Sequence, residues 1–165
     1  MAIIVRPYRE PDRATLKRLT IDAFEGVSID HAIDRVLGPL ATSDWRDRKG
    51  RHVDEDVDAA DGAVDVAEAS GEILGYVSMR FDRDASVGRI PNVVVAPVAR
   101  GQGLGRRLLE HAIGRFRAEG MRVARIETLE GNPIGRHLYP SVGFLEVARQ
   151  VHYAMPLEPE PGPTT

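Results

Sequence analysis

Residues 100–107 contain three glycines at alternate positions and three arginines, in the order Arg-Gly-Gln-Gly-Leu-Gly-Arg-Arg. From residue 104 onward, apolar residues recur at helical spacing, which predicts an amphipathic helix that ends near Gly120. The first turn of a helix carries unpaired backbone N–H groups and the positive end of the helix dipole. Glycines let such amides approach a ligand closely and converge on phosphate oxygens. The pattern predicts a diphosphate site, although glycines also form plain turns.

Two other phosphate-binding motifs fit this stretch poorly. A nucleoside-triphosphate loop requires Gly-Lys-Ser/Thr, but Gly105 is followed by Arg106. A dinucleotide fingerprint counted from Gly101 requires its third glycine where Arg106 stands. Only about 60 residues follow the loop, too few for the usual further βαβ units.

Two segments resemble motifs of the GNAT superfamily of N-acetyltransferases. Residues 95–105, VAPVARGQGLG, resemble its acyl-CoA-binding signature, with Arg100, Gly103 and Gly105 in the three signature positions. Residues 129–144, LEGNPIGRHLYPSVGF, are similar to its later motif, matched by Asn132, Leu138, Tyr139, Gly143 and Phe144. Two motifs in the family's order are more specific than either alone. The resemblance covers roughly residues 2–153.

The resemblance implies an α/β (α+β) fold, with a mixed central sheet of about six to seven strands flanked by about four helices. The fourth and fifth strands would splay apart, and the pantetheine of acetyl-CoA would lie between them. Its amides would pair with the strand backbone as an added strand does. The residues expected to bind acetyl-CoA are Val93, Val94, Val95, Arg100, Gly101, Gln102, Gly103, Leu104, Gly105, Arg106, Asn132 and Arg136. Pro91 independently predicts a bulge or an edge in the fourth strand, because proline cannot donate a ladder hydrogen bond.

The chemistry that the resemblance implies is direct transfer of an acetyl group to a primary amine of a small molecule, peptide or protein. The chain has no cysteine, which excludes an acyl-cysteine intermediate. Tyr139 matches the family's tyrosine near the CoA sulfur, where a phenol can protonate the leaving thiolate; a packed amphipathic tyrosine is the alternative. Around the expected bulge stand Arg89 and Asn92 instead of a carboxylate. Glu127 is therefore the candidate base, with a water relay as the alternative.

A second class of function stays open, namely a non-catalytic acyl-CoA-binding regulator or sensor of the same fold. The lack of a clear base favours it, whereas Tyr139 argues against it. Asn132 also has a purely structural interpretation, because an asparagine before a proline is typical of a helix N-cap.

Strand and helix periodicities alternate around these motifs. Strands are expected at 2–6, 63–69, 73–81, 87–96, 122–129 and 144–155, and helices at 11–24, 28–37, after the glycines, and from Asn132. The polar stretch 41–62 is expected to be a long loop. By resemblance it forms part of the acceptor site, where its aspartates could attract a cationic amine, although a solvated loop is the usual meaning of such a run.

Composition limits the number of domains, the classes of partner and the location that can be expected. The 165 residues, 42% of them hydrophobic, suit one domain over 1–154, followed by a proline-rich disordered tail at 155–165. A net charge of -3 offers no overall attraction to nucleic acid or to an anionic membrane, and no signal or membrane-spanning pattern is present. The five histidines form no pair at helical spacing, so no metal is expected. We expect a cytosolic protein, and the family's habits allow a homodimer.

Overall fold

Six strands and five α-helices make up the part of the chain that the computed structural model describes, residues 2–40 and 42–157. The strands are β1 Ile4–Pro7, β2 Gly62–Ala69, β3 Glu72–Asp82, β4 Val87–Ile90, β5 Val93–Val95 and β6 Val123–Ile126. The helices are α1 Arg13–Phe24, α2 Ile29–Leu37, α3 Trp45–Val57, α4 Leu104–Ala118 and α5 Pro133–Val142. The predicted tail lies outside the described residues from residue 158 onward.

The strands form one mixed sheet in the order β1-β2-β3-β4-β6, and β5 also pairs with β3. Strands that follow one another in the chain, from β1 to β4, pair antiparallel. β4 and β6 are parallel, and α4 forms the crossover between them. The hairpin predicted at 63–81 is present, and its turn has positive φ at Ser70 and Gly71, as a type I′ turn requires. The predicted α/β fold with a mixed sheet is therefore confirmed.

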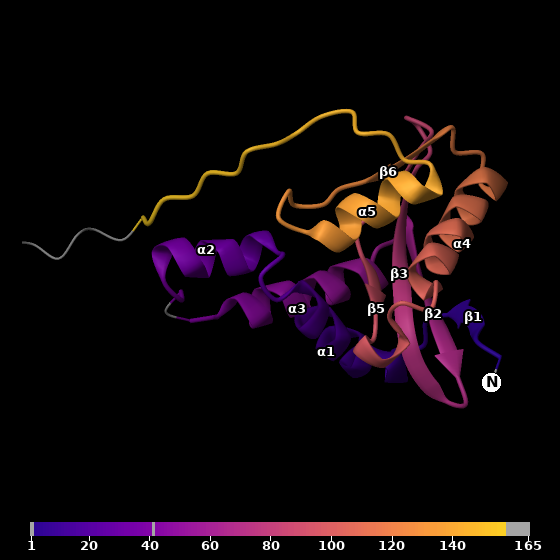
Figure 1. The fold of residues 1–165 in the computed structure, drawn as a ribbon, viewed down its shortest axis with the longest axis horizontal. Helices are drawn as coiled ribbons and strands as arrows, with labels where there is room; N and C mark the ends of the chain where they lie inside the picture. The colour runs from indigo at the N-terminus through magenta and orange to yellow at the C-terminus, as the bar shows by residue number, and fades with distance from the viewer. Residues whose placement is uncertain (1, 41, 158–165) are drawn as a thin grey trace, which may run out of the picture.

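Helices cover both faces of this sheet, α1 and α3 on one side and α4 with α5 on the other (Figure 1). Side chains of β3 alternate between the two faces, as those of any strand do. Tyr76 joins a core cluster with Leu16 and Val53 on the α1 side, whereas Val77 joins a cluster with Leu108 on the α4 side. The sequence thus builds two apolar layers around one sheet.

Residues 45–57 form helix α3, so the predicted long loop at 41–62 is wrong. The carboxylate of Asp44 caps the helix by accepting hydrogen bonds from two amides of its first turn. Trp45, Lys49 and Val53 recur every four residues and lie buried on one face. The helix has no clear apolar periodicity because its buried face includes a lysine and an aspartate, which hides the helical signal.

Residues 144–155 form no strand, in contrast to the prediction. The segment leaves α5 and runs in an extended course beyond the sheet (Figure 1). Leu145 is 84% exposed, and Val147 and Tyr153 are each 93% exposed. A strand needs a hydrogen-bonding neighbour as well as an alternating pattern, and this segment has no strand partner in the described part of the chain.

Gly88 is expected to be essential for packing between β4 and α4. A Cβ at this position would lie 2.4 Å from the Phe116 ring, so Gly88→Ala should lower the free energy of unfolding by about 1–3 kcal/mol in urea titrations. Gly114→Ala is the matched control. No atom lies within 4 Å of its Cβ position in the middle of α4, so it should stabilise the protein by about 0.5–1 kcal/mol. Equal effects of the two substitutions would contradict this packing role.

Candidate active site

A β-bulge interrupts the strand that was predicted at 87–96. Residues 90–92 lie opposite only two residues of β3, Ser78 and Met79, because the register shifts by one between β4 and β5. An extra residue on one strand of an antiparallel pair is a bulge. Pro91 lies within it, as predicted from its missing N–H group.

Beyond this bulge the neighbouring strands part. β6 pairs with β4, while β5 has only β3 as a strand partner in the described part of the chain. One backbone edge of β5 therefore has no strand beside it. Val93 and Val95 on this edge are half-buried, and the Arg100 side chain donates a 3.2 Å hydrogen bond from Nε to the Val95 carbonyl. The edge can accept an extended ligand in the way that a sheet accepts a strand.

The glycine loop begins immediately after β5 and opens α4. Gly101 and Gly103 have φ of +71° and +79°, and no atom lies within 4 Å of a Cβ built on either. Gly103 is the N-cap of α4, and the first backbone hydrogen bond of the helix joins the amide of Arg107 to its carbonyl at 3.0 Å. The amides of residues 104–106 consequently lack intrahelical acceptors and are available to an anion.

Gly105 and Arg106 have a further role that sequence reasoning missed. Gly105 is helical, and a Cβ there would lie 3.1 Å from Cδ2 of Leu138, so its small size lets α5 approach α4. The Arg106 guanidinium donates to the carbonyl and the hydroxyl oxygen of Ser141, at 3.0 and 2.9 Å. These contacts fix α5 next to the glycine loop.

Tyr139 lies on α5 and packs against the same core cluster as α4. Its ring meets Phe144 edge to face, with centroids 6.3 Å apart. Burial raises the pKa of Tyr139 to about 12, so the phenol keeps its proton at neutral pH. A Cβ built on Gly105 would lie 3.1 Å from Leu138 and 3.7 Å from Val95. The helix that carries Tyr139 therefore lies near the free edge of β5.

The N-cap interpretation of Asn132 is confirmed at the start of α5. Its Oδ1 accepts a 3.4 Å hydrogen bond from the amide of Gly135, and its Nδ2 donates to Thr128 at 3.0 Å. Arg136, one turn later, lines an open hollow of about 480 Å³ together with Glu130 and His137. Asn132 and Arg136 thus lie at one end of the helix whose middle carries Tyr139.

Glu127 directly follows β6 and forms ion pairs with two arginines. Arg89 lies 2.9 Å and Arg125 2.5 Å from its carboxylate oxygens. Partial burial would raise the pKa of Glu127, but the two guanidiniums outweigh it and lower the pKa. Ala124 and Ile126 of β6 pack on the α4 side, so the alternation of side chains places Arg125 on the opposite face. A carboxylate paired in this way is a weak proton acceptor.

A buried polar cluster behind the bulge is the main site feature that sequence reasoning missed. Lys49 of α3 donates to Oδ1 of Asn92 at 3.1 Å and lies 3.9 Å from the centre of the Phe24 ring. Nδ2 of Asn92 in turn donates to Asp56 at 2.7 Å, and Asp56 pairs with Arg80 at 3.1 Å. Because 41–62 was predicted to be a loop, nothing in the sequence indicated that Lys49 would reach the bulge.

The acetyltransferase (GNAT) family model matches residues 31–144, which is more than half of the chain. The chain belongs to the GNAT family. This membership agrees with the motifs at the glycine loop and at α5, both of which fall within the matched region or at its end.

Relatives of this GNAT chain carry several names. The aminoglycoside N(6')-acetyltransferase type 1 of Stenotrophomonas maltophilia is 33% identical over 112 residues, which cover 61% of this chain and 71% of that protein. The IAA acetyltransferase of Azospirillum brasilense is 33% identical over 81 residues, 49% of this chain and 53% of that protein. The mycothiol acetyltransferase of Beutenbergia cavernae is 43% identical over 91 residues, 54% of this chain and 30% of that protein. The chain thus spans about half of the IAA acetyltransferase and less than a third of the mycothiol acetyltransferase.

Solved structures share the GNAT fold of this chain. The ribosomal-protein-S18-alanine N-acetyltransferase of Escherichia coli has a TM-score of 0.67 at 17% identity and covers 89% of this chain and 80% of its own. AAC(6')-Iy in complex with the bisubstrate analog CoA-S-monomethyl-acetylneamine also has a TM-score of 0.67 at 17% identity. The match covers 94% of this chain and 99% of that chain. At these identities the likeness establishes the fold.

The acidic residues around α3 have protein partners in this GNAT chain. Arg13 forms ion pairs with Asp54 at 2.8 Å and Asp58 at 2.9 Å, and Arg80 pairs with Asp56 and, at 3.5 Å, with Asp61. Three of the protein's own cations, Arg13, Lys17 and Arg80, therefore offset part of the negative charge that was expected to attract a cationic amine.

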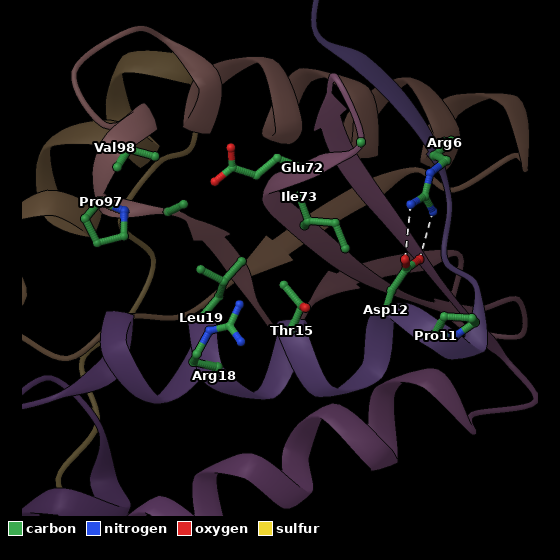
Figure 2. A pocket seen from close by; sticks show the side chains of 12 residues that line it. Arg6, Pro11, Asp12, Thr15, Arg18, Leu19, Glu72, Ile73, Pro97 and Val98 are labelled. Carbon is green, nitrogen blue, oxygen red and sulfur yellow. Dashed lines mark hydrogen bonds and ion pairs between the residues drawn. The ribbon is translucent and has the colours of Figure 1, made fainter.

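A second hollow of about 480 Å³ lies between the start of α1, the β2–β3 turn and residues 96–98 (Figure 2). The ion pair between Arg6 and Asp12, at 2.8 Å, forms one side of it. Among the described residues, those that line it include neither the expected catalytic residues nor the expected acetyl-CoA contacts. In the same part of the chain, no cluster of metal-binding side chains and no helix suited to crossing a membrane occurs.

Lys49 should give the protein's stability a measurable dependence on pH. Burial lowers the pKa of Lys49 from 10.5, against the opposing effect of nearby carboxylates. Between the folded pKa and 10.5 the unfolded state binds more protons, so stability should rise with pH, by at most about 1.4 kcal/mol per pH unit. Lys49→Met should remove this rise, which urea titrations at increasing pH up to 10.5 measure. Lys17→Met, at the chain's only other lysine, should retain it; an unchanged slope in Lys49→Met would refute the assignment.

Proposed function

We propose that this protein is an N-acetyltransferase that transfers the acetyl group of acetyl-CoA directly to a primary amine of a small molecule, peptide or protein. The observation that carries the proposal is the free edge of β5 at the bulge, which opens between the glycine loop and the helix of Tyr139 in a GNAT chain. The activities of the named relatives support an acetyl transfer to an amine, and the acceptor of this chain is a separate question.

The residues around this edge fit acetyl-CoA. Positive φ and open space at Gly101 and Gly103 leave the backbone accessible, and the amides of residues 104–106 have no helical partners. A pyrophosphate would bind these amides. The backbone edge of Val93 and Val95, which has no strand beside it, would bind the pantetheine amides once the Arg100 side chain leaves the Val95 carbonyl. Arg100 is exposed between the β5 edge and the glycine loop, and it can add a charge-assisted hydrogen bond to the pyrophosphate. AAC(6')-Iy, which binds a CoA-containing analog, has the same fold.

Acetyl-CoA, when bound, supplies an acetyl group activated as a thioester. In our proposal the side chain of Tyr139 holds a proton until the sulfur departs and then donates it to the thiolate. Because burial raises its pKa to about 12, the phenol is protonated at neutral pH and can donate a hydrogen bond to the sulfur as negative charge develops there. The attacking amine must be neutral, and water is a better candidate than Glu127 for removing its proton because Glu127 is paired with Arg89 and Arg125.

The acceptor amine would approach from the face that carries α1 and α3. Asn92 and Lys49 lie buried at the bulge on that side, and the Arg89–Glu127 pair lies on the exposed part of the same face. Asn92 is held by Lys49, Asp56 and Ser78 together, which keeps the bulge rigid. We propose that this rigid bulge positions the amine and the thioester relative to each other.

The experiment that tests the function measures release of the CoA thiol when acetyl-CoA is mixed with a panel of primary amines. The panel contains an aminoglycoside, a peptide with N-terminal alanine and a peptide with internal lysine. Because the chain has no cysteine, a thiol reagent detects CoA without background from the protein. Amine-dependent thiol release supports the transferase. Acetyl-CoA binding without release for any amine favours the non-catalytic sensor, and no binding by the folded protein overturns both.

Cytosolic location remains a prediction from composition. It is checked by fractionating cells that express the full chain and locating the protein with an antibody.

A further inference from the structure

The hollow beside α1, drawn in Figure 2, is bordered by three segments that are distant in sequence. They are the start of α1, the start of β3 after the β2–β3 turn, and residues 96–98, which lead from β5 to the glycine loop. Its volume of about 480 Å³ lies within the range of about 300–1,000 Å³ that is common for small-molecule pockets. None of the described residues that line it is expected to contact acetyl-CoA or to act in catalysis. A molecule bound here would therefore occupy a second site.

The lining of this hollow combines an apolar base with polar groups at its sides. The base includes the buried side chains of Leu19 and Ala96 and the half-buried side chain of Ile73. Thr15 is three residues before Arg18 and four before Leu19, so the three side chains share one side of α1. An apolar chain can pack on this base while its two ends reach the polar groups.

Two of the charged side chains that line the hollow are free to bind a ligand. Arg6 is already held by Asp12 at 2.8 Å and by Glu68 at 2.6 Å. Arg18 and Glu72 are exposed, and neither forms a hydrogen bond or an ion pair with another residue in the described part of the chain. Figure 2 shows them on facing sides of the hollow, Arg18 on α1 and Glu72 at the start of β3. The hollow therefore offers one free cation and one free anion to the same molecule.

We propose that this hollow is a binding site for a small amino acid whose carboxylate and ammonium groups are separated by an apolar chain. The carboxylate would accept hydrogen bonds from the Arg18 guanidinium, and the ammonium would donate to the Glu72 carboxylate. The chain between them would pack on Leu19 and Ile73, and the Thr15 hydroxyl can add a hydrogen bond at the α1 side. A simple anion would be repelled by Glu72 and a polyamine by Arg18, so the charges select a molecule that carries both.

Calorimetric titration tests the class of ligand. γ-Aminobutyrate and ε-aminocaproate are titrated into the full chain in a buffer of low ionic strength, because salt screens exposed charges. At least one of them should bind. Caproate lacks the ammonium and hexylamine lacks the carboxylate, so each should bind roughly 5- to 10-fold more weakly. The proposal is wrong if neither amino acid binds, or if a ligand with a single charge binds as tightly.

Arg18→Gln and Glu72→Gln test whether the ligand occupies this hollow. Each removes one charge from an exposed side chain without a partner among the described residues, so the stability in urea titrations should be unchanged. Each should weaken binding of the amino acid roughly 5- to 10-fold. Arg51→Gln is the matched control, because it removes the same charge from an exposed arginine of α3 outside the lining. Wild-type affinity in either Arg18→Gln or Glu72→Gln overturns the proposal.

A titration in the presence of saturating CoA separates this hollow from the proposed acetyl-CoA site. CoA carries no acetyl group, so no transfer to the amino acid can occur during the titration. The amino acid should bind with CoA present, and Arg18→Gln should still weaken that binding. Displacement of the amino acid by CoA would mean that the two share one site, and it would refute the proposal. None of these titrations measures acetyl transfer, so their outcome is independent of the proposed transferase activity.

Discussion

The Tyr139→Phe variant is expected to bind acetyl-CoA as tightly as the wild type and to release CoA thiol roughly 10²–10⁴-fold more slowly. The hydroxyl group is the only part removed, and general acid catalysis contributes about this much to a rate. The ring, which packs against the α4-side core and meets Phe144 edge to face, is retained. The measurements are the dissociation constant from calorimetry and kcat from thiol release with the best amine.

Tyr8→Phe is the control for this experiment. It removes a tyrosine hydroxyl whose hydrogen bond goes to Glu10 at the protein surface, 2.8 Å away, so turnover should be unchanged. Since burial raises the pKa of Tyr139 to about 12, the wild-type rate should show no loss from phenol ionisation between pH 7 and about pH 10. Wild-type turnover in Tyr139→Phe would remove the hydroxyl from the mechanism.

Gly103→Glu should weaken acetyl-CoA binding by on the order of 100-fold or more. The substitution places a carboxylate at the N-cap of α4, where the free amides of residues 104–106 would otherwise bind a pyrophosphate. Loss of two or three charge-assisted hydrogen bonds, each worth about 1.5–3 kcal/mol, accounts for an effect of this size. Calorimetric titration with acetyl-CoA measures it directly.

Gly120→Glu provides a matched control at the other end of α4. Gly120 has φ of +78° and no atom within 4 Å of its Cβ position, close to the values at Gly103. Both variants therefore carry the same kind of backbone strain and the same added charge. Because the helix dipole favours a carboxylate at the N-terminus and disfavours one at the C-terminus, Gly120→Glu should unfold at the lower urea concentration. Only the variant at residue 103 should lose acetyl-CoA. Equal affinities in the two variants would mean that the glycine loop is simply a turn.

The sequence was informative wherever backbone chemistry leaves a direct signature. Pro91 predicted the bulge because it lacks an N–H group, Asn132 predicted the start of α5 because it precedes a proline, and the glycines predicted the opening of α4. These signals depend on one or two residues and not on the rest of the fold. The motif resemblance then supplied the family, which the family model confirms.

Features that depend on distant partners were missed. Helix α3 was taken for a loop because Lys49, polar in the sequence, is buried by contacts with Asn92 and Phe24 that only the fold creates. The opposite error occurred at 144–155, where the alternation typical of a strand is present but no partner strand lies alongside within the described chain. In both regions the outcome depends on what the rest of the fold places next to the segment.

The enclosure of Lys49 also bears on chemical self-modification. Thioesters acetylate accessible amines without a catalyst, and a protein that holds acetyl-CoA is exposed to this reaction continually. The chain has only two lysines, and the amine of one is covered by Phe24 and Asn92. Lys17, whose side chain is 36% exposed and paired with Asp54 at 2.6 Å, is the one lysine left within reach of such damage. Arginine, which thioesters do not acylate, supplies nearly all of the protein's other positive charge.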